Sequence, residues 1–447
     1  MTALYDSKRQ CRVPLDGDSP DASPSSESKF NVQRACISSN AQTPVLATRR
    51  DALHRLPTEL LVEIFQHFLD PAAHFNPRSN APWLLSHVCR HWRSVALGSP
   101  RLWRRFVLPD DLQYFKPTID LVAVQLERAR NIPLSLHLSD VGLGQKILDL
   151  FLPVSARWED AEVILDTSNR FFLTNFPVLW KLVLETIWDI PASAKMVDSL
   201  PALRHLELRT SLDRLPPLLF PWSQLTVCSL SGATAVNALR ILSQLSAATE
   251  FSLAGSRRGM GTLVKAEAPI TTLALTNSLS AATHILNHLT APNLDTLTLE
   301  DFDFWDGSSD GTALSAMLAR VPPFLERSSC LLRRITINCA IAGADLFCIL
   351  ESPYVQGIVH LDLNVRQMKV PGLWVTTVTS RLPNLGILIL RECRQNLLSQ
   401  LEEAVRSTPG RKSAIRRAPD LFDLGAPKEH SDLEVIISDV NKYNRSL

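Results

Sequence analysis

One short apolar pattern recurs from Leu134 to Leu390, in which a loop residue is followed by Leu-x-x-Leu-x-Leu or a degenerate version of it. The clearest copies are residues 202–208, 293–299 and 384–390. Such a pattern places alternate apolar side chains on one face of a short strand and the residue between them on the other. The last apolar residues of eleven copies stand at positions 138, 165, 184, 208, 230, 253, 275, 299, 337, 363 and 390.

Nine of the ten intervals between these positions are 19 to 27 residues long, and one is 38. This spacing resembles that of leucine-rich repeats, which run about 20–29 residues. Helix-like apolar stretches such as 235–242 and 281–289 lie between the strands. We therefore predict an α/β fold in which residues 131–400 form an irregular leucine-rich-repeat-like solenoid, with a curved parallel sheet and outer helices. A doubly wound α/β domain is the alternative, although its strands are usually longer apolar runs.

The residues between the strand leucines face away from the core and form a candidate binding surface for a target protein. Their mixture of charged and hydroxyl side chains suits a protein partner but does not identify a particular ligand. The 38-residue interval contains an insertion near 302–323 with Trp305 among aspartates, and aromatic anchors dominate interface energetics. The candidate target-binding residues are His205, Glu207, Arg209, Thr298, Glu300, Trp305, Asn338, Asp362 and Asn364.

Motifs for metals, cofactors and catalysis are missing from the sequence. The aspartates around Trp305 do not fit a calcium loop, because Trp305 takes the third ligand place and Ala313 or Leu314 stands where glutamate is required. The eight cysteines contain no CxxC pair and no zinc spacing with histidine. Nucleophile-elbow, phosphate-loop and zinc-protease motifs are also absent. We expect no metal, no cofactor and no catalytic residue, and an enzyme with an unmarked site in the solenoid concavity is only a third interpretation.

Three short helices are expected before the repeats. The first begins after Leu56-Pro57, with Thr58 as N-cap, and carries an apolar stripe through Phe68. The second runs from Trp83 to Leu97, with its arginines on the solvent side, and the third covers 99–106. Three helices in about fifty residues cannot bury all their apolar faces among themselves. One face is therefore expected to remain free for a partner.

The order of the motifs in this region, LPxELLxxIF, VCRxW and SPxLW, resembles the F-box-like family in its large fungal branch. The loop 70–82 is longer than in compact F-boxes, and the Leu-Pro pair lies well inside the chain. The resemblance implies a non-catalytic adaptor whose F-box docks on the Skp-type adaptor of an SCF-type cullin ubiquitin ligase, while the solenoid holds a protein substrate. The adaptor-binding residues carried over from the motif are Leu56, Pro57, Leu60, Ile64, Phe65, Val88, Trp92, Leu102 and Trp103.

Other interpretations remain open at this point. The F-box could pair with the adaptor alone, without a cullin. The chain could also be a non-ligase protein-binding scaffold whose helical cap is purely structural. Capture of the adaptor separates these accounts, and capture of the cullin separates the ligase from the adaptor-only complex.

Composition and charge limit which partners and which compartment are expected. With 447 residues, 45% of them hydrophobic, and a net charge of +1, the chain offers no overall charge bias toward nucleic acid or an anionic membrane. No signal segment opens the sequence, and no run of eighteen apolar residues occurs. We expect a protein of the cytoplasm, the nucleus or both, with free thiols, no nucleic-acid partner and no membrane.

The expected domain order follows from these signals. Residues 1–48 are Ser/Pro/Asp-rich and are predicted to be a disordered tail. The F-box-like domain spans 51–109, a linker helix spans 110–130, and the solenoid follows to residue 400. Residues 401–447 are expected to form a C-terminal cap, with a solvated basic loop at 411–417 and one closing strand at 432–437.

Overall fold

The computed structural model describes most of the chain after the predicted tail. The described residues are 56–70, 75–76, 80–108, 118–138, 144–165, 175–186, 200–210, 220–255, 264–300, 311–339, 341–365, 377–393, 403, 413–417 and 433–439. The predicted tail at 1–48 and Trp305 lie outside these residues.

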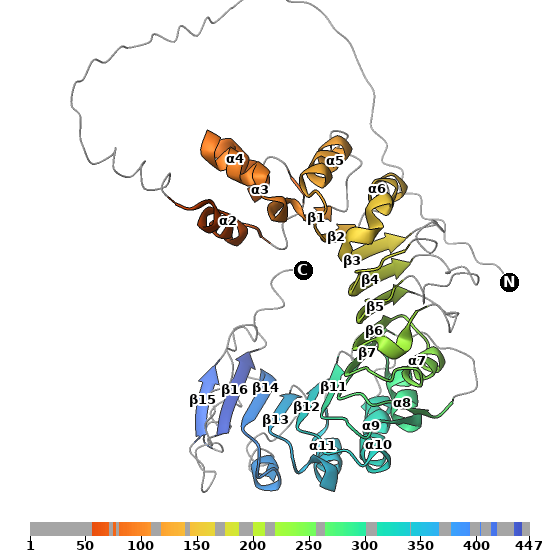
Figure 1. Cartoon of the computed structure of the whole chain (residues 1–447). Coiled ribbons are helices and arrows are strands. Elements are labelled where there is room, and N and C mark those ends of the chain that lie inside the picture. Colours follow the sequence, from red (N-terminus) through yellow and green to blue (C-terminus); the bar gives the residue numbers. More distant parts are fainter. Residues whose placement is uncertain are drawn as a thin grey trace, which may run out of the picture. The chain divides into compact units, whose positions relative to one another are not determined.

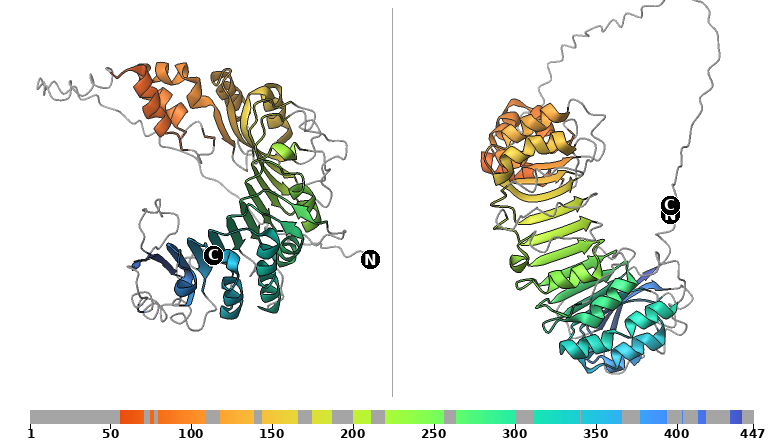
Figure 2. Two further views of the ribbon diagram at one scale, coloured as in Figure 1. Left: turned by 60° about the horizontal axis from the view of Figure 1, so that its bottom comes forward. Right: turned by 90° about the vertical axis from the view of Figure 1, so that its right-hand side faces the viewer.

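The strands form an open, parallel sheet. Fourteen of them follow the order β1-β2-β3-β4-β5-β6-β7-β9-β11-β12-β13-β14-β16-β15, and β8 pairs with β10 in a separate two-stranded sheet. Figure 1 and Figure 2 show successive strands side by side along the large sheet. The strands are β1 (Arg105–Leu108), β2 (Leu134–Leu138), β3 (Trp158–Leu165), β4 (Lys181–Thr186), β5 (His205–Thr210), β6 (Val227–Ser231), β7 (Glu250–Ala254), β8 (Ala266–Glu267), β9 (Thr272–Thr276), β10 (Leu289–Thr290), β11 (Thr296–Glu300), β12 (Arg334–Asn338), β13 (His360–Asn364), β14 (Ile387–Cys393), β15 (Ser413–Arg417) and β16 (Leu433–Asp439).

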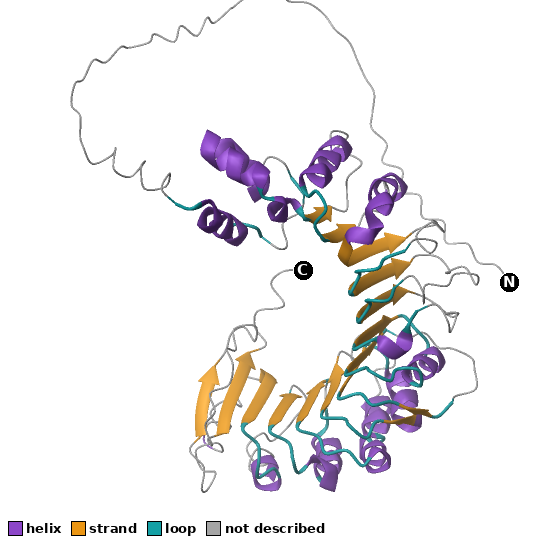
Figure 3. Ribbon diagram, in the orientation of Figure 1, coloured by secondary structure: helices purple, strands orange, loops and turns teal. Residues whose placement is uncertain are grey.

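Helices α7 to α11 lie on one side of this sheet (Figure 3). The strand-plus-helix unit and the open parallel sheet confirm the predicted solenoid-like α/β fold. All eleven predicted strands are present, and the helix predicted at 235–242 is α7. The helical segments are α2 (Thr58–His67), α3 (Ala81–Val88), α4 (Arg90–Gly98), η1 (Pro100–Trp103), α5 (Thr118–Arg128), α6 (Gly144–Phe151), η3 (Leu152–Arg157), η5 (Trp222–Gln224), α7 (Ala235–Leu242), α8 (Leu279–His288), α9 (Gly311–Leu318), α10 (Val321–Ser328), α11 (Gly343–Leu350) and η6 (Pro353–Val355).

Two continuous rows of buried apolar side chains run across the sheet on its helix-covered side. The register aligns Leu206 of β5 with Cys228 of β6, and Leu208 with Leu230, and it keeps this alignment through β7, β9 and β11. Each strand thus contributes two buried side chains, worth about 1.5–3 kcal/mol each. This repeated burial is what makes the short strands stable as neighbours.

Threonine hydroxyls add a second link between repeats, just before the strands begin. The hydroxyl of Thr226 donates to the carbonyl of Arg204, that of Thr249 to Thr226, and that of Thr271 to Thr249, at 3.1, 3.1 and 2.9 Å. The backbone N–H groups of the same three threonines donate to the same carbonyls. Neighbouring repeats are therefore linked by hydroxyl groups that the Leu-x-x-Leu-x-Leu pattern did not single out.

The helices before the repeats differ in detail from the prediction. Thr58 is not the N-cap: Pro57 holds that position without a side-chain cap, and Thr58 is the first helical residue. The second predicted helix is two helices, because Cys89 adopts an extended conformation between α3 and α4. The Cys89 Sγ then accepts a hydrogen bond from the Trp92 N–H at 3.4 Å and caps α4. The third predicted helix is the short η1, followed directly by β1.

The sheet extends beyond both of its predicted ends. Strand β1 lies inside the predicted F-box span and pairs in parallel with β2, so the sheet begins before residue 131. At the other end, residues of the basic run form β15, not a solvated loop. The predicted closing strand is β16, but it lies between β14 and β15 and leaves β15 at the edge.

Removing one buried leucine tests the contribution of the rows. Leu297 of β11 is fully buried, and Leu297→Ala is expected to lower the free energy of unfolding by about 2–5 kcal/mol through lost burial and a new cavity. Thr298→Ala, next to it on the opposite face, should change it by about 0.5 kcal/mol or less. Thermal unfolding followed by circular dichroism measures both. Equal shifts in the two variants would contradict the assignment of faces.

Candidate functional site

Helices α2 and α3 present a cluster of exposed apolar side chains. Of the ten large apolar side chains that are exposed among the described residues, five lie on these helices or at the end of α2. We call these five the apolar face. Its members and their exposed fractions are Leu60 (53%), Ile64 (38%), Phe68 (63%), Leu84 (46%) and Val88 (60%).

The spacing of these residues explains why they are exposed together. Leu60, Ile64 and Phe68 recur every four residues and share one side of α2, while Leu61 and Phe65 are buried on the other. On α3, Leu84 and Val88 are again four residues apart. The described helices α2, α3 and α4 contact one another, so their inward sides form the small core and the apolar face is left over. An exposed apolar cluster of this kind is a candidate interaction site.

The structure divides the residues predicted to bind the adaptor into two groups. Leu60, Ile64, Val88 and Pro57 are exposed, and Leu56 and Trp92 are half-buried. The other three are buried in the core and cannot serve as docking contacts in this conformation, which corrects the prediction. These three are Phe65, Leu102 and Trp103.

The buried residues instead support the apolar face from beneath. The Phe65 ring on α2 lies 4.9 Å from the Trp92 ring on α4, measured between centroids. Phe68 and Leu84 were not among the predicted contacts, although both are more than 40% exposed. The four-residue spacing from Ile64 to Phe68 and from Leu84 to Val88 was the signal that could have found them.

A buried polar and aromatic cluster joins these helices to the first strand. Gln125 of α5 accepts a hydrogen bond from the Trp83 Nε1 at 3.2 Å and donates to the carbonyls of Trp103 and Arg105 at 3.3 and 2.8 Å. The Trp103 Nε1 donates to the carbonyl of Ala96 at 2.8 Å. One side chain of α5 therefore holds α3, η1 and β1 together.

Arg128 completes this junction by packing against both indole rings. Its guanidinium carbon is 4.4 Å from the Trp83 ring centroid and 4.5 Å from that of Trp103. The rings themselves meet edge to face at 5.2 Å. Burial and the nearby charge of Arg93 lower the pKa of Arg128, and its buried Nη1 has no hydrogen-bond partner. Cation–π attraction is the interaction that offsets this desolvation.

Gln125 offers a direct test of the junction. Gln125→Ala removes three hydrogen bonds and leaves the buried Trp83 Nε1 without its acceptor, which is expected to cost about 1–3 kcal/mol of unfolding free energy. Glu127→Gln, at an exposed position of the same helix, is the control and should stay within about 0.5 kcal/mol. Denaturant unfolding monitored by tryptophan fluorescence reports on both. No loss of stability in Gln125→Ala would contradict the role given to the cluster.

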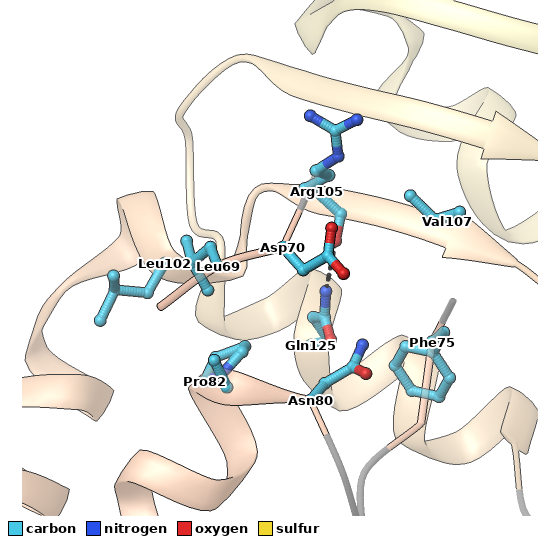
Figure 4. Close-up of a pocket in the computed structure, with 10 residues that line it drawn as sticks. Leu69, Asp70, Phe75, Asn80, Pro82, Leu102, Arg105, Val107 and Gln125 are labelled. Carbon is cyan, nitrogen blue, oxygen red and sulfur yellow. Dashed lines mark hydrogen bonds between the residues drawn. The ribbon is translucent and has the colours of Figure 1, made fainter. Parts of the chain in front are cut away.

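A small pocket lies beside the junction (Figure 4). It has about 50 Å³ of free volume, far below the roughly 300 Å³ or more of a ligand pocket. Its lining residues come from α3, η1, β1, α5 and the segment after α2, and they are Leu69, Asp70, Phe75, Asn80, Ala81, Pro82, Leu102, Arg105, Val107 and Gln125. This pocket can hold a few water molecules but not an organic substrate.

The face of the sheet opposite the buried leucines is the second candidate site. Parallel register places its side chains in three rows that cross the strands. Glu207 and Thr298 belong to the central row, which also contains Asp362. His205 belongs to the row on one side, and the row on the other side contains Arg209 and Glu300. The predicted outward positions are therefore brought onto one face, except Trp305, which is not described.

Charged residues of β2, β3 and β5 form a network on this face. The Glu162 carboxylate contacts the His137 Nδ1 and the Arg209 Nη1, both at 2.7 Å, and Arg209 Nε donates to Glu207 at 2.7 Å. Burial lowers the pKa of Arg209, but its hydrogen bond with Glu207 and the charges of Glu207 and Glu162 raise it by more. Arg209 is thus held cationic between two carboxylates.

Two of the predicted target-binding residues are not available for contact. Asp362 is 3% exposed and receives two hydrogen bonds from Arg391 of β14, at 2.8 and 2.6 Å. Asn364 is also buried, and its Nδ2 donates to the Asn338 Oδ1 at 3.3 Å. Both side chains serve to connect neighbouring strands, which corrects their assignment to the binding surface. Their outward position was predictable from alternation, whereas their burial depends on partners distant in sequence.

One comparison with known proteins covers the helices of the first site. A family model described as F-box-like matches residues 53–109, the segment that contains α2, α3, α4 and η1. Residues 53–109 form an F-box-like domain. No curated protein matches the chain. A solved structure of a protein from Bacteroides fragilis is similar at 11% identity with a TM-score of 0.33, over 56% of this chain and 72% of that one.

The F-box-like domain contains the apolar face and the Trp83–Trp103 cluster described above. Domains of this family are typically non-enzymatic adaptors in SCF-type ubiquitin ligase complexes. Within the described ranges, histidine, cysteine and carboxylate side chains form no cluster of three or more that could hold a metal. None of the described helices has both the length and the apolar character needed to cross a bilayer.

Proposed function

We propose that this protein is the substrate-recognition adaptor of an SCF-type cullin ubiquitin ligase. The F-box-like domain binds the Skp-type adaptor subunit through the apolar face, and the outward face of the large sheet binds the target protein. The chain supplies no nucleophile in this scheme. It raises the effective concentration of the target beside subunits that transfer ubiquitin.

The apolar face is the observation that carries this proposal. Its five side chains are exposed although they are large and apolar, and two of them, Phe68 and Val88, have exposed fractions of 60% or more. They lie in the segment that matches the F-box-like model. Covering them with a partner would remove apolar surface from water at about 25 cal/mol per Å².

The state of the cysteine side chains fits the same proposal. Among the described residues, Cys89, Cys228, Cys330 and Cys348 are free thiols, and Cys228 and Cys330 are buried. Burial raises the pKa of Cys228 to about 12 and that of Cys330 to about 11, so both remain thiols at neutral pH. Unpaired, protonated thiols are suited to the reducing cytoplasm or nucleus, where we place the protein.

Charge substitution on the apolar face tests adaptor binding. Leu60→Asp combined with Val88→Asp is expected to abolish capture of the Skp-type adaptor, because a carboxylate would be desolvated at the interface. Both positions are exposed, so the thermal midpoint should change little. A pull-down of the full chain with the purified adaptor measures adaptor capture. A second pull-down with the adaptor and the cullin together measures recruitment of the cullin.

The matched control carries the same chemical change at exposed apolar positions elsewhere. Val178 and Leu331 are 43% and 66% exposed, and Val178→Asp with Leu331→Asp should leave adaptor capture intact. Adaptor capture without the cullin would favour an adaptor-only complex. Failure of the intact chain to capture the adaptor would leave the F-box helices as a structural cap on a protein-binding scaffold, and the ligase proposal would be withdrawn.

A further inference from the structure

Negative charge is concentrated on one part of the outward sheet face. Strands β3, β4, β5 and β7 present five outward carboxylates against the two cations Lys181 and Arg209, a net charge of −3 with imidazoles neutral. The whole chain carries +1, so this excess is local. We call these five carboxylates the acidic patch, and they are Asp160, Glu162, Glu185, Glu207 and Glu250.

The register shows that the acidic patch is continuous across strands. Asp160 is aligned with Lys181 of the next strand, and Lys181 is aligned with His205. In the same row, His205 is aligned with Val227, and Val227 with Glu250. The charges of Asp160, Glu207 and Glu250 all act on His205, while burial and Lys181 lower its pKa. A neutral imidazole therefore lies among three carboxylates and does not cancel their charge.

Three of the five carboxylates have no ion pair with any described residue. Glu162 and Glu207 share Arg209. By contrast, Asp160, Glu185 and Glu250 form no salt bridge in the part of the chain that the structure describes. Unpaired carboxylates on a half-exposed face favour a cationic partner and disfavour a phosphate backbone.

An exposed tryptophan lies at the margin of the acidic patch. Trp180, immediately before β4, is 45% exposed, and its ring meets the His205 ring edge to face with centroids 6.5 Å apart. Exposed tryptophans beside carboxylates are suited to cations, because the indole face attracts guanidinium and ammonium groups. Tryptophan is also among the residues that contribute most to binding at protein interfaces.

The remaining part of the face has a different character. The outward residues of β6 and β9 are neutral, and the Ser252 hydroxyl of β7 donates a hydrogen bond to the Ser229 hydroxyl of β6 at 2.7 Å. Farther along, Asp362 is paired with Arg391, and Ile389 packs with Ile436 as a buried apolar pair. The acidic patch is thus the part of the outward face where several carboxylates adjoin, whereas the charged residues of β11 and β12 on this face are the single Glu300 and Arg334.

We infer that the acidic patch and Trp180 bind a lysine- and arginine-rich segment of the target protein. This inference rests on the proposed function, because it assigns the chemistry of the target that the solenoid holds. The cationic side chains lie against the carboxylates, and Trp180 receives one of them on its indole face. An extended segment of about seven residues spans the distance from β3 to β7, at roughly 3.3 Å per residue against 4.8 Å per strand.

A labelled heptapeptide alternating arginine and serine is the probe, and its fluorescence anisotropy with the full chain is the measurement. Asp160→Asn, Glu185→Gln and Glu250→Gln together are expected to weaken its binding by about tenfold, at roughly 0.5 kcal/mol per exposed charge. The matched control removes three exposed carboxylates elsewhere, by Glu127→Gln, Glu267→Gln and Glu326→Gln. It changes net charge equally and should bind as the wild type does.

Trp180→Leu supplies a second variant that keeps an apolar side chain but removes the indole face. It is expected to weaken binding of the arginine peptide severalfold and to leave the thermal midpoint unchanged, because Trp180 is exposed. Binding should also fall as salt is raised from 0.05 to 0.5 M, since exposed charges are screened. A peptide with glutamate in place of arginine should not bind.

Three results would overturn the inference. They are equal binding by the patch variant and its matched control, equal binding of the arginine and glutamate peptides, and tighter binding of a single-stranded oligonucleotide than of the arginine peptide. The outcome is separate from that of the ligase proposal. If the patch variant still captures the Skp-type adaptor but the peptide never binds, only the target chemistry fails. If the peptide binds and the adaptor does not, the patch functions outside a ligase.

Discussion

Packing of the Arg128 guanidinium against the indoles of Trp83 and Trp103 is the interaction on which the arrangement of the F-box-like domain depends. The two rings belong to α3 and η1, and Arg128 belongs to α5, which covers the start of the sheet. Gln125 adds hydrogen bonds to Trp103 and Arg105 from the same helix. The inward sides of the helices are therefore occupied by the junction, and their outward apolar side chains have no partner within it.

Register across the parallel sheet has a comparable consequence for the second surface. Because each strand is aligned with its neighbours, side chains spaced by a repeat in sequence become neighbours in a row. A local excess of carboxylates in β3, β4, β5 and β7 becomes one acidic patch, whereas single aspartates such as Asp362 are neutralised by an arginine of the next strand. Binding character is thus decided by which charges the register brings together.

Periodicity predicted most of the architecture, and the elements that it failed to predict have physical explanations. The eleven strands followed from Leu-x-Leu alternation, because burial on one face requires it. Strand β1 was missed since Phe106-Val107-Leu108 follows a helix-like motif with no repeat spacing before it. The F-box motif identified the right helices but could not separate exposed Leu60 from buried Phe65. That distinction depends on Trp92, 27 residues farther along, which packs on Phe65.

The central claim is that the apolar face on α2 and α3 is a binding surface supported by the aromatic core beneath it. Hydrogen exchange of the full chain with and without the purified Skp-type adaptor tests this claim most directly. The account predicts slower exchange in α2 and α3 on adding the adaptor, with β5 to β11 unchanged. Protection confined to the sheet, or no change in α2 and α3 at saturating adaptor, would contradict it.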